Sequence, residues 1–157
     1  MNIRLIAVGK TDHNQLQALM DEYQKRLSFY IKFDLEIIPD IKNVKNLSEA
    51  QQKEKEGELI LAKISATDQL ILLDENGKTF SSVNFAAELQ KKMNSGIKTL
   101  VFVIGGPYGF SQAVYDKAQG KISLSPMTFS HQMVRLFFIE QLYRGFTILK
   151  NEPYHHQ

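Results

Sequence analysis

Two loops that follow apolar segments contain the residues best suited to bind a ligand. The first loop is Ile104-Gly105-Gly106-Pro107-Tyr108-Gly109, and the second is Leu124-Ser125-Pro126-Met127-Thr128-Phe129-Ser130. Glycines in the first loop let the backbone and its N–H groups approach a ligand closely. In the second loop, backbone groups could match the edges of an adenine while Leu124, Met127 and Leu73 cover its faces. Together the loops predict a pocket for a nucleotide-like cofactor at the carboxyl ends of parallel strands.

Neither loop is specific by itself. The glycine loop matches neither the dinucleotide-binding fingerprint nor a Walker loop, and it could be a tight turn between a strand and a helix. The second loop could be a plain apolar connection in which Ser130 caps the next helix. No Lys or Arg lies between Ile104 and Ala113, which counts against phosphate binding at the glycine loop.

The last helical segment combines titratable residues with an unusually apolar surface. His131 and Arg135 are one turn apart and share a face. His131 could act as a base, contact a phosphate, or simply be a polar residue at a helix start. Phe137, Phe138 and Ile139 are consecutive, so a single stripe of the helix cannot bury all three. This helix is therefore either central in the fold or in contact with another chain, and we favour a homodimer interface.

The end of the chain offers further polar and aromatic groups. Glu140 and Arg144 are one turn apart, and an exposed salt bridge is their simplest interpretation. Tyr154 and His155 could stack on a nucleobase and contact a phosphate, or they could belong to a frayed terminus. His155 and His156 are adjacent with no carboxylate at ligand spacing, so the sequence predicts no metal site.

Apolar segments alternating with helical patterns must position these loops. The expected strands are Asn2–Val8, Phe33–Ile38, Gln69–Leu73, Lys98–Ile104 and Lys121–Leu124. The expected helices are Asn14–Ser28, Ser48–Ile64, Ser82–Met93, Ser111–Ala118 and His131–Leu149. This alternation predicts an α/β fold with a mostly parallel sheet covered on both faces. Asp74-Glu75-Asn76-Gly77-Lys78 is expected to form a turn after the third strand, either on the surface or at the rim of the pocket.

Composition sets broad limits on the class of protein. The 157 residues, with 43% hydrophobic and 23% charged, suit one globular domain spanning 1–157. The absence of cysteine excludes disulfides and thiolate chemistry and favours a cytoplasmic protein. The apolar start is too short to span a membrane. A net charge of +2 neither excludes an RNA partner nor argues for one.

Taken together, these motifs resemble a single family. The matching segments are Val103-Ile104-Gly105-Gly106-Pro107-Tyr108-Gly109, the loop from Leu124 to Ser130 with His131, Val134-Arg135, Glu140-Gln141-Leu142-Tyr143-Arg144 and Pro153-Tyr154-His155. The sequence resembles the RlmH family, small bacterial SPOUT-class methyltransferases that modify N3 of a pseudouridine in large-subunit rRNA. The resemblance extends from Ile3 to the tail and includes the step Lys55-Glu56-Gly57.

The resemblance implies properties that the spacing alone does not show. The fold would be a Rossmann-like α/β sheet with a C-terminal trefoil knot, and the cofactor-binding knot would span about 70–157. The cofactor would be S-adenosylmethionine. Its pocket would be lined by Leu73, Gly105, Leu124, Ser125, Pro126, Met127, Thr128 and Phe129. The protein would act as a homodimer through its last helix, late, on rRNA in the assembled ribosome, without a metal or a membrane.

The chemistry of this reaction suggests roles for five residues. His131 is the candidate base for the N3 proton, although solvent could also accept it. Arg135 and Arg144 are candidates for stabilising charge or holding phosphate. Tyr154 and His155 would close over the target nucleotide, from the same chain or from the partner.

Two departures from the family pattern concern the helix entry and the tail. Ser130 stands where the family usually has Pro, and we expect a Ser cap to replace the rigid entry. His156-Gln157 replaces a terminal cation, which predicts a weaker or pH-dependent phosphate contact. The alternatives are a ribosome-associated protein of the same fold without transferase activity, and a small nucleotide-binding α/β protein. The first predicts little binding of S-adenosylmethionine, and the second predicts a preference for phosphorylated nucleotides.

Overall fold

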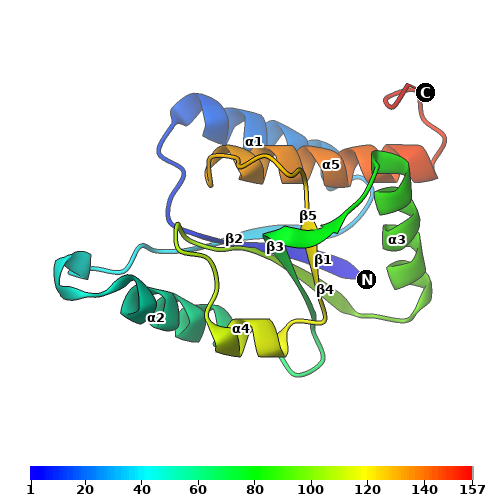
Figure 1. The fold of residues 1–157 in the computed structure, drawn as a ribbon. Helices are drawn as coiled ribbons and strands as arrows, with labels where there is room; N and C mark the ends of the chain where they lie inside the picture. Colours follow the sequence, from blue (N-terminus) through cyan, green and yellow to red (C-terminus); the bar gives the residue numbers. More distant parts are fainter. Residues whose placement is uncertain (157) are drawn as a thin grey trace.

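A parallel β-sheet forms the centre of the computed structural model, which describes residues 1–156 (Figure 1). The strands are β1 (Asn2–Val8), β2 (Phe33–Ile38), β3 (Gln69–Thr79), β4 (Thr99–Ile104) and β5 (Gly120–Ser123). The helices are α1 (Asn14–Leu27), the 3-10 helix η1 (Val44–Asn46), α2 (Glu49–Leu61), α3 (Ser82–Asn94), α4 (Gln112–Lys117) and α5 (Met133–Leu149). The strand order is β2-β1-β4-β3-β5, and every neighbouring pair is parallel. The predicted α/β architecture is confirmed. Gln157, one of the two tail residues that differ from the family pattern, lies outside the described residues.

Helices cover both faces of this sheet. α1, α3 and α5 pack on one face, and α2 and α4 pack on the other (Figure 1). Strand side chains alternate between the two layers, so that Ile3 of β1 joins the core beneath α1 and α5, whereas Ile6 and Val8 join the core beneath α2 and α4. Phe102 of β4 contacts Phe138 of α5 with ring centroids 4.8 Å apart. The apolar surface of α5 is therefore partly explained by its central position over the sheet.

The parallel register brings three loops to the same edge of the sheet. Ala7 of β1 and Leu73 of β3 both pair with Ile104 of β4. The loops after β1 and β4 and the bulge that follows Leu73 within β3 consequently begin side by side. A ligand pocket is expected at such an edge.

β3 is longer than predicted and contains a bulge. The segment Asp74–Lys78, expected to be a turn, continues the strand, and Ile122 of β5 pairs with both Leu73 and Lys78. The residues between those two pairing positions have no partner on β5. Gly77 permits the return to β5, because a Cβ there would lie 2.5–2.7 Å from backbone atoms of Ile122. The predicted turn was wrong because the strand resumes through a non-local contact, in which Lys78 and Thr79 pair with β5.

Serine caps define the starts of three helices, whereas α5 starts differently. Ser48 forms a capping box with Gln51 at α2, while Ser81 and Ser111 cap α3 and α4. α5 begins at Met133 instead of the predicted His131. Ser130 Oγ accepts hydrogen bonds from the backbone N–H groups of Gln132 at 3.3 Å and Met133 at 3.5 Å. The N-cap position of α5 is nevertheless Gln132, whose side chain forms no capping hydrogen bond, so the predicted Ser130 cap was wrong. His131 therefore lies in the turn before the helix.

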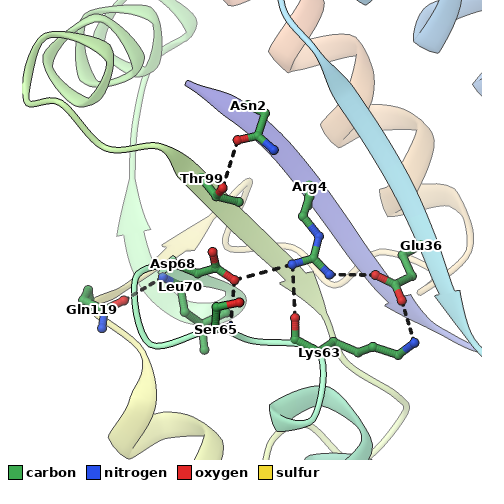
Figure 2. A network of polar contacts seen from close by, with 9 residues as sticks. All are labelled: Asn2, Arg4, Glu36, Lys63, Ser65, Asp68, Leu70, Thr99 and Gln119. Atoms are coloured by element: carbon green, nitrogen blue, oxygen red, sulfur yellow. Dashed lines mark hydrogen bonds and ion pairs between the residues drawn. The ribbon is translucent and has the colours of Figure 1, made fainter.

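A polar network joins the α2–β3 connection to the sheet (Figure 2). Arg4 of β1 forms an ion pair with Glu36 of β2 at 2.8 Å and donates to the carbonyl of Lys63 at 3.1 Å. Lys63 Nζ in turn contacts Glu36 at 2.7 Å, and hydrogen bonds from Lys63 and Arg4 lower the pKa of Glu36. Asp68 lies 3.5 Å from Arg4 and accepts a hydrogen bond from the backbone N–H of Ser65 at 2.9 Å. These contacts fix the connection against β1 and β2.

Candidate functional site

A cavity of about 420 Å³ lies at the bulge of β3, beside the carboxyl ends of β4 and β5. Its wall consists of residues 73–76 in the bulge of β3, the glycine loop 104–110, residues 122–125 and 127–129, and Tyr115, His131 and Val134. The two loops singled out in the sequence thus face the same space. This volume falls within the range of about 300–1,000 Å³ found for small-molecule sites.

Most residues predicted to bind the cofactor lie in this wall. They are Leu73, Gly105, Leu124, Ser125, Met127, Thr128 and Phe129. Pro126 is exposed in the same loop but does not line the cavity. Hydrogen bonds within the loop shape it: Ser123 Oγ donates to the Ser125 carbonyl at 2.8 Å, and the Met127 N–H donates to Ser125 Oγ at 3.0 Å.

An acidic segment at the β3 bulge forms part of the wall and was only partly anticipated. Asp74, Glu75 and Asn76 line the cavity, which supports the pocket-rim interpretation of this segment over the surface turn. Asp74 Oδ1 accepts the Asn76 N–H at 2.8 Å, and its other oxygen accepts the hydroxyl of Tyr115. Burial and the hydrogen bond to Asp74 raise the pKa of Tyr115 to about 12. Asp74 and Tyr115 are far apart in sequence, so no local pattern indicates their pairing.

The charges in the wall have one sign. Among the described residues that line the cavity, Asp74 and Glu75 are carboxylates and none is Lys or Arg. A wall of this kind attracts a cation and disfavours a phosphate group. The cavity is therefore better suited to a cationic ligand than to a nucleotide phosphate.

The two residues predicted to share the start of the last helix have different surroundings. His131 is exposed and lines the cavity. Arg135 is 0% exposed: its Nη atoms donate to the carbonyls of Val8 and Gly9, each at 2.7 Å, and to Thr11 Oγ1 at 3.2 Å. Arg135 Nε also donates to the carbonyl of His131 at 3.2 Å. Burial lowers the pKa of Arg135, and nearby acidic groups oppose this effect.

This environment changes what Arg135 can do. Its guanidinium is enclosed by the loop after β1 and the turn before α5, so an RNA phosphate has no access to it. The helical spacing correctly placed Arg135 one turn from His131, but it could not show which side of the helix faces the protein interior. The geometry gives Arg135 an anchoring role.

The remaining predicted residues form a cluster at the other end of α5. Arg144 forms the predicted ion pair with Glu140 at 2.6 Å, but the two side chains are half-buried instead of exposed. Tyr154 donates its hydroxyl to Glu140 at 2.9 Å and lies 3.2 Å from the hydroxyl of Tyr23. Arg144 also lies 3.2 Å from His155 Nδ1 and over the Tyr154 ring at 4.7 Å. The tail is therefore packed against α5 and α1 rather than frayed.

This tail cluster and the cavity are far apart within one chain. α5 has 17 residues, which corresponds to a length of about 25 Å. His131 precedes its first residue, whereas Tyr154 and His155 follow its last (Figure 1). A single chain therefore does not bring the tail to the cavity.

The described residues contain no group of three or more His, Cys, Asp or Glu side chains arranged to hold a metal ion. None of the helices formed by residues 1–156 is long and apolar enough to cross a lipid bilayer.

Comparison with known proteins identifies the family. Residues 1–155 match the family model described as "Predicted SPOUT methyltransferase". The proteins named ribosomal RNA large subunit methyltransferase H from Flavobacterium johnsoniae and Flavobacterium psychrophilum are each 85% identical to this chain over 157 residues. The protein of the same name from Christiangramia forsetii is 65% identical over 157 residues, and in all three cases both chains are covered completely.

The chain belongs to the SPOUT methyltransferase family. The resemblance to the RlmH methyltransferases that the sequence motifs indicated is thereby confirmed. The parallel sheet with helices on both faces agrees with this family, and the C-terminal trefoil knot is what membership implies.

Proposed function

We propose that this protein transfers a methyl group from S-adenosylmethionine to N3 of a pseudouridine in large-subunit rRNA. The observation that carries the proposal is the cavity between the β3 bulge and the glycine loop, where the described lining residues include two carboxylates and no Lys or Arg. The names of the relatives support large-subunit rRNA as the substrate class. The pseudouridine target, the late action on assembled ribosomes and the cytoplasmic location follow from the resemblance to the RlmH family.

The residues of the cavity fit S-adenosylmethionine. Leu73, Ile122 and Leu124 offer apolar surface for the faces of an adenine, and the loop 124–129 offers backbone groups for its edges. Asp74 and Glu75 supply the negative potential that favours a positively charged cofactor. When bound, this cofactor supplies a methyl group on a positively charged sulfur, which is a good leaving group.

The contribution of the protein is alignment and removal of a proton. The exposed His131 in the cavity wall is positioned to accept the N3 proton of the target base, with solvent as the alternative acceptor. Arg135 holds the turn that contains His131 against the loop after β1. Arg135 is thus a positioning residue in this scheme, in place of the phosphate contact suggested by its sequence.

We further propose that the site is completed by a second copy of the chain. Leu19 of α1 and Met133 and Phe137 of α5 are 39–50% exposed, which is unusual for large apolar side chains and suits an interface along these helices. A partner packed against α5 could bring its own tail cluster to the cavity. Arg144, with the tail residues, would then hold or cover the target nucleotide in the partner's pocket.

Mixed dimers test this arrangement. Leu124→Arg blocks the cavity, whereas Arg144→Ala disrupts the tail cluster. If the tail acts in the partner's pocket, an equal mixture of the two variants regains about a quarter of wild-type activity, because half of the dimers contain one intact site of two. If both elements act within one chain, the mixture stays inactive. Circular dichroism of each variant checks that it folds.

Methyl transfer itself is measured with radiolabelled S-adenosylmethionine and ribosomes that lack the modification. The proposal predicts incorporation into large-subunit rRNA of assembled ribosomes, located at a pseudouridine by mass spectrometry. His131→Ala should slow methyl transfer while leaving cofactor binding nearly intact. If the variant instead loses cofactor binding, His131 is part of the pocket wall and is not the base. A folded protein that binds ribosomes without transferring a methyl group would support the non-catalytic alternative.

A further inference from the structure

A buried carboxyl group lies behind the glycine loop and has no role in the reaction proposed above. Glu56 of α2 is 4% exposed, and among the described residues its Oε2 is the one buried side-chain polar atom without a hydrogen-bond partner. Its Oε1 accepts a hydrogen bond from Gln52 Nε2 at 3.2 Å. Because an unsatisfied buried polar group reduces stability, its presence at this position requires an explanation.

The carboxyl of Glu56 is in close contact with the glycine loop. A Cβ at Gly106 would lie 2.7 Å from both carboxyl oxygens, so a larger residue there would force the Glu56 side chain to move. Gly106 begins a tight turn in which the Gly109 N–H donates to the Gly106 carbonyl at 3.2 Å. The same turn lines the cofactor cavity. Glu56 therefore touches, from behind, a turn whose other side forms the pocket wall.

We propose that Glu56 is a positioning residue that supports the Gly106–Gly109 turn and thereby sets the shape of the cofactor pocket. This inference rests on the proposed function, because it assumes that the cavity binds S-adenosylmethionine. The contact explains why a carboxyl with an unused oxygen is placed at this buried point of α2. It also gives a role to the Lys55-Glu56-Gly57 step, which the proposed reaction leaves without one.

The surroundings of Glu56 favour its neutral form. Burial raises the pKa of Glu56, the hydrogen bond from Gln52 opposes this, and nearby Asp40 raises it again. Glutamine has nearly the same shape and no charge, so Glu56→Gln should preserve the contact with the turn that Glu56→Ala removes.

Binding of S-adenosylmethionine, measured by calorimetry, tests this assignment. We expect Glu56→Gln to bind within about twofold of wild type and Glu56→Ala to bind about fivefold to tenfold more weakly, because a cavity of side-chain size would open behind the turn. At saturating cofactor, kcat of Glu56→Ala should stay near that of the wild type. Glu54→Ala, on the exposed side of the same helix, is the matched control and should bind normally.

A double-mutant cycle shows whether the effect passes through the turn. Gly106→Ala should weaken binding because its methyl group collides with Glu56, and adding Glu56→Ala should restore part of that loss. Additive losses, or unchanged binding by a folded Glu56→Ala variant, would overturn the assignment.

Hydrogen exchange at the Gly109 amide separates this inference from the proposed function. Exchange should be faster in Glu56→Ala than in Glu54→Ala even without cofactor, because the Gly109 N–H bonds within the supported turn. If the wild-type protein binds no S-adenosylmethionine but exchange still differs between the two variants, the cofactor assignment is refuted and the support of the turn by Glu56 is retained. Equal exchange in the two variants would refute the support itself.

Discussion

Arg135→Met tests whether the buried guanidinium anchors the fold or contacts the substrate. The arginine is 0% exposed and donates to the carbonyls of Val8 and Gly9, each at 2.7 Å. Methionine fills much of the same volume but leaves both buried carbonyls without their partner. At about 1–3 kcal/mol for each unsatisfied group, the free energy of unfolding should fall by about 2–6 kcal/mol. Removal of a buried charge offsets part of this cost, so we expect a loss of about 3 kcal/mol.

Denaturant unfolding followed by circular dichroism measures this loss. Lys91→Ala is the control, because the exposed Lys91 side chain pairs with Glu88 on the surface of α3 and its removal should change the free energy of unfolding little. Binding of S-adenosylmethionine to the folded Arg135→Met variant should weaken, since the turn before α5 loses its anchor. A loss below about 1 kcal/mol, combined with normal cofactor binding and abolished methyl transfer, would show that Arg135 acts on the substrate.

Three further changes probe the pocket and the polar network. Tyr115→Phe removes the hydroxyl that holds Asp74 and should weaken binding of S-adenosylmethionine by about threefold to tenfold, as calorimetry can show. Burial and that hydrogen bond raise the pKa of Tyr115 to about 12. The stability that the Tyr115 hydroxyl contributes is therefore present below pH 10 and is lost as the pH rises through 12. Tyr115→Phe should lack this alkaline loss of stability when unfolding is measured as a function of pH. Gly77→Ala places a methyl group 2.5–2.7 Å from backbone atoms of Ile122 in β5, so the variant should unfold at a lower temperature and bind the cofactor more weakly. An unchanged unfolding temperature and unchanged binding would refute the close packing of the bulge. Lys63→Met removes a hydrogen bond that lowers the pKa of Glu36. The stability from this pair is present above pH 4.5 and is lost as the pH falls through the lower pKa of the folded state, so the variant should lose less stability as the pH falls below 4.5.

Local pattern explains why most of the fold was predictable from the sequence. β4 reads as a continuous apolar, largely β-branched run, which is typical of a strand buried on both faces of a parallel sheet. Ser48 and Ser111 mark helix starts through hydrogen bonds that span only three residues. Such signals depend only on neighbours in the chain, so they can be recognised without knowledge of the tertiary structure.

The features that escaped prediction depend on contacts between distant residues. The extension of β3 beyond Leu73 requires a second pairing with β5, and the burial of Arg135 depends on the loop after β1. The hydrogen bond from Tyr115 to Asp74 joins residues 41 positions apart, so no local pattern indicated it. The carboxyl of Glu56 acquires significance only because α2 packs against the glycine loop. In each case the chemistry of the residue was visible, but its partner was not.

Calorimetric titration of the purified protein with S-adenosylmethionine, with ATP and NAD as controls, tests the central claim most directly. The acidic, phosphate-disfavouring wall predicts saturable binding of S-adenosylmethionine and little binding of either control. A folded protein that binds no S-adenosylmethionine, or that prefers ATP or NAD, would contradict the assignment of this cavity as the methyl-donor site.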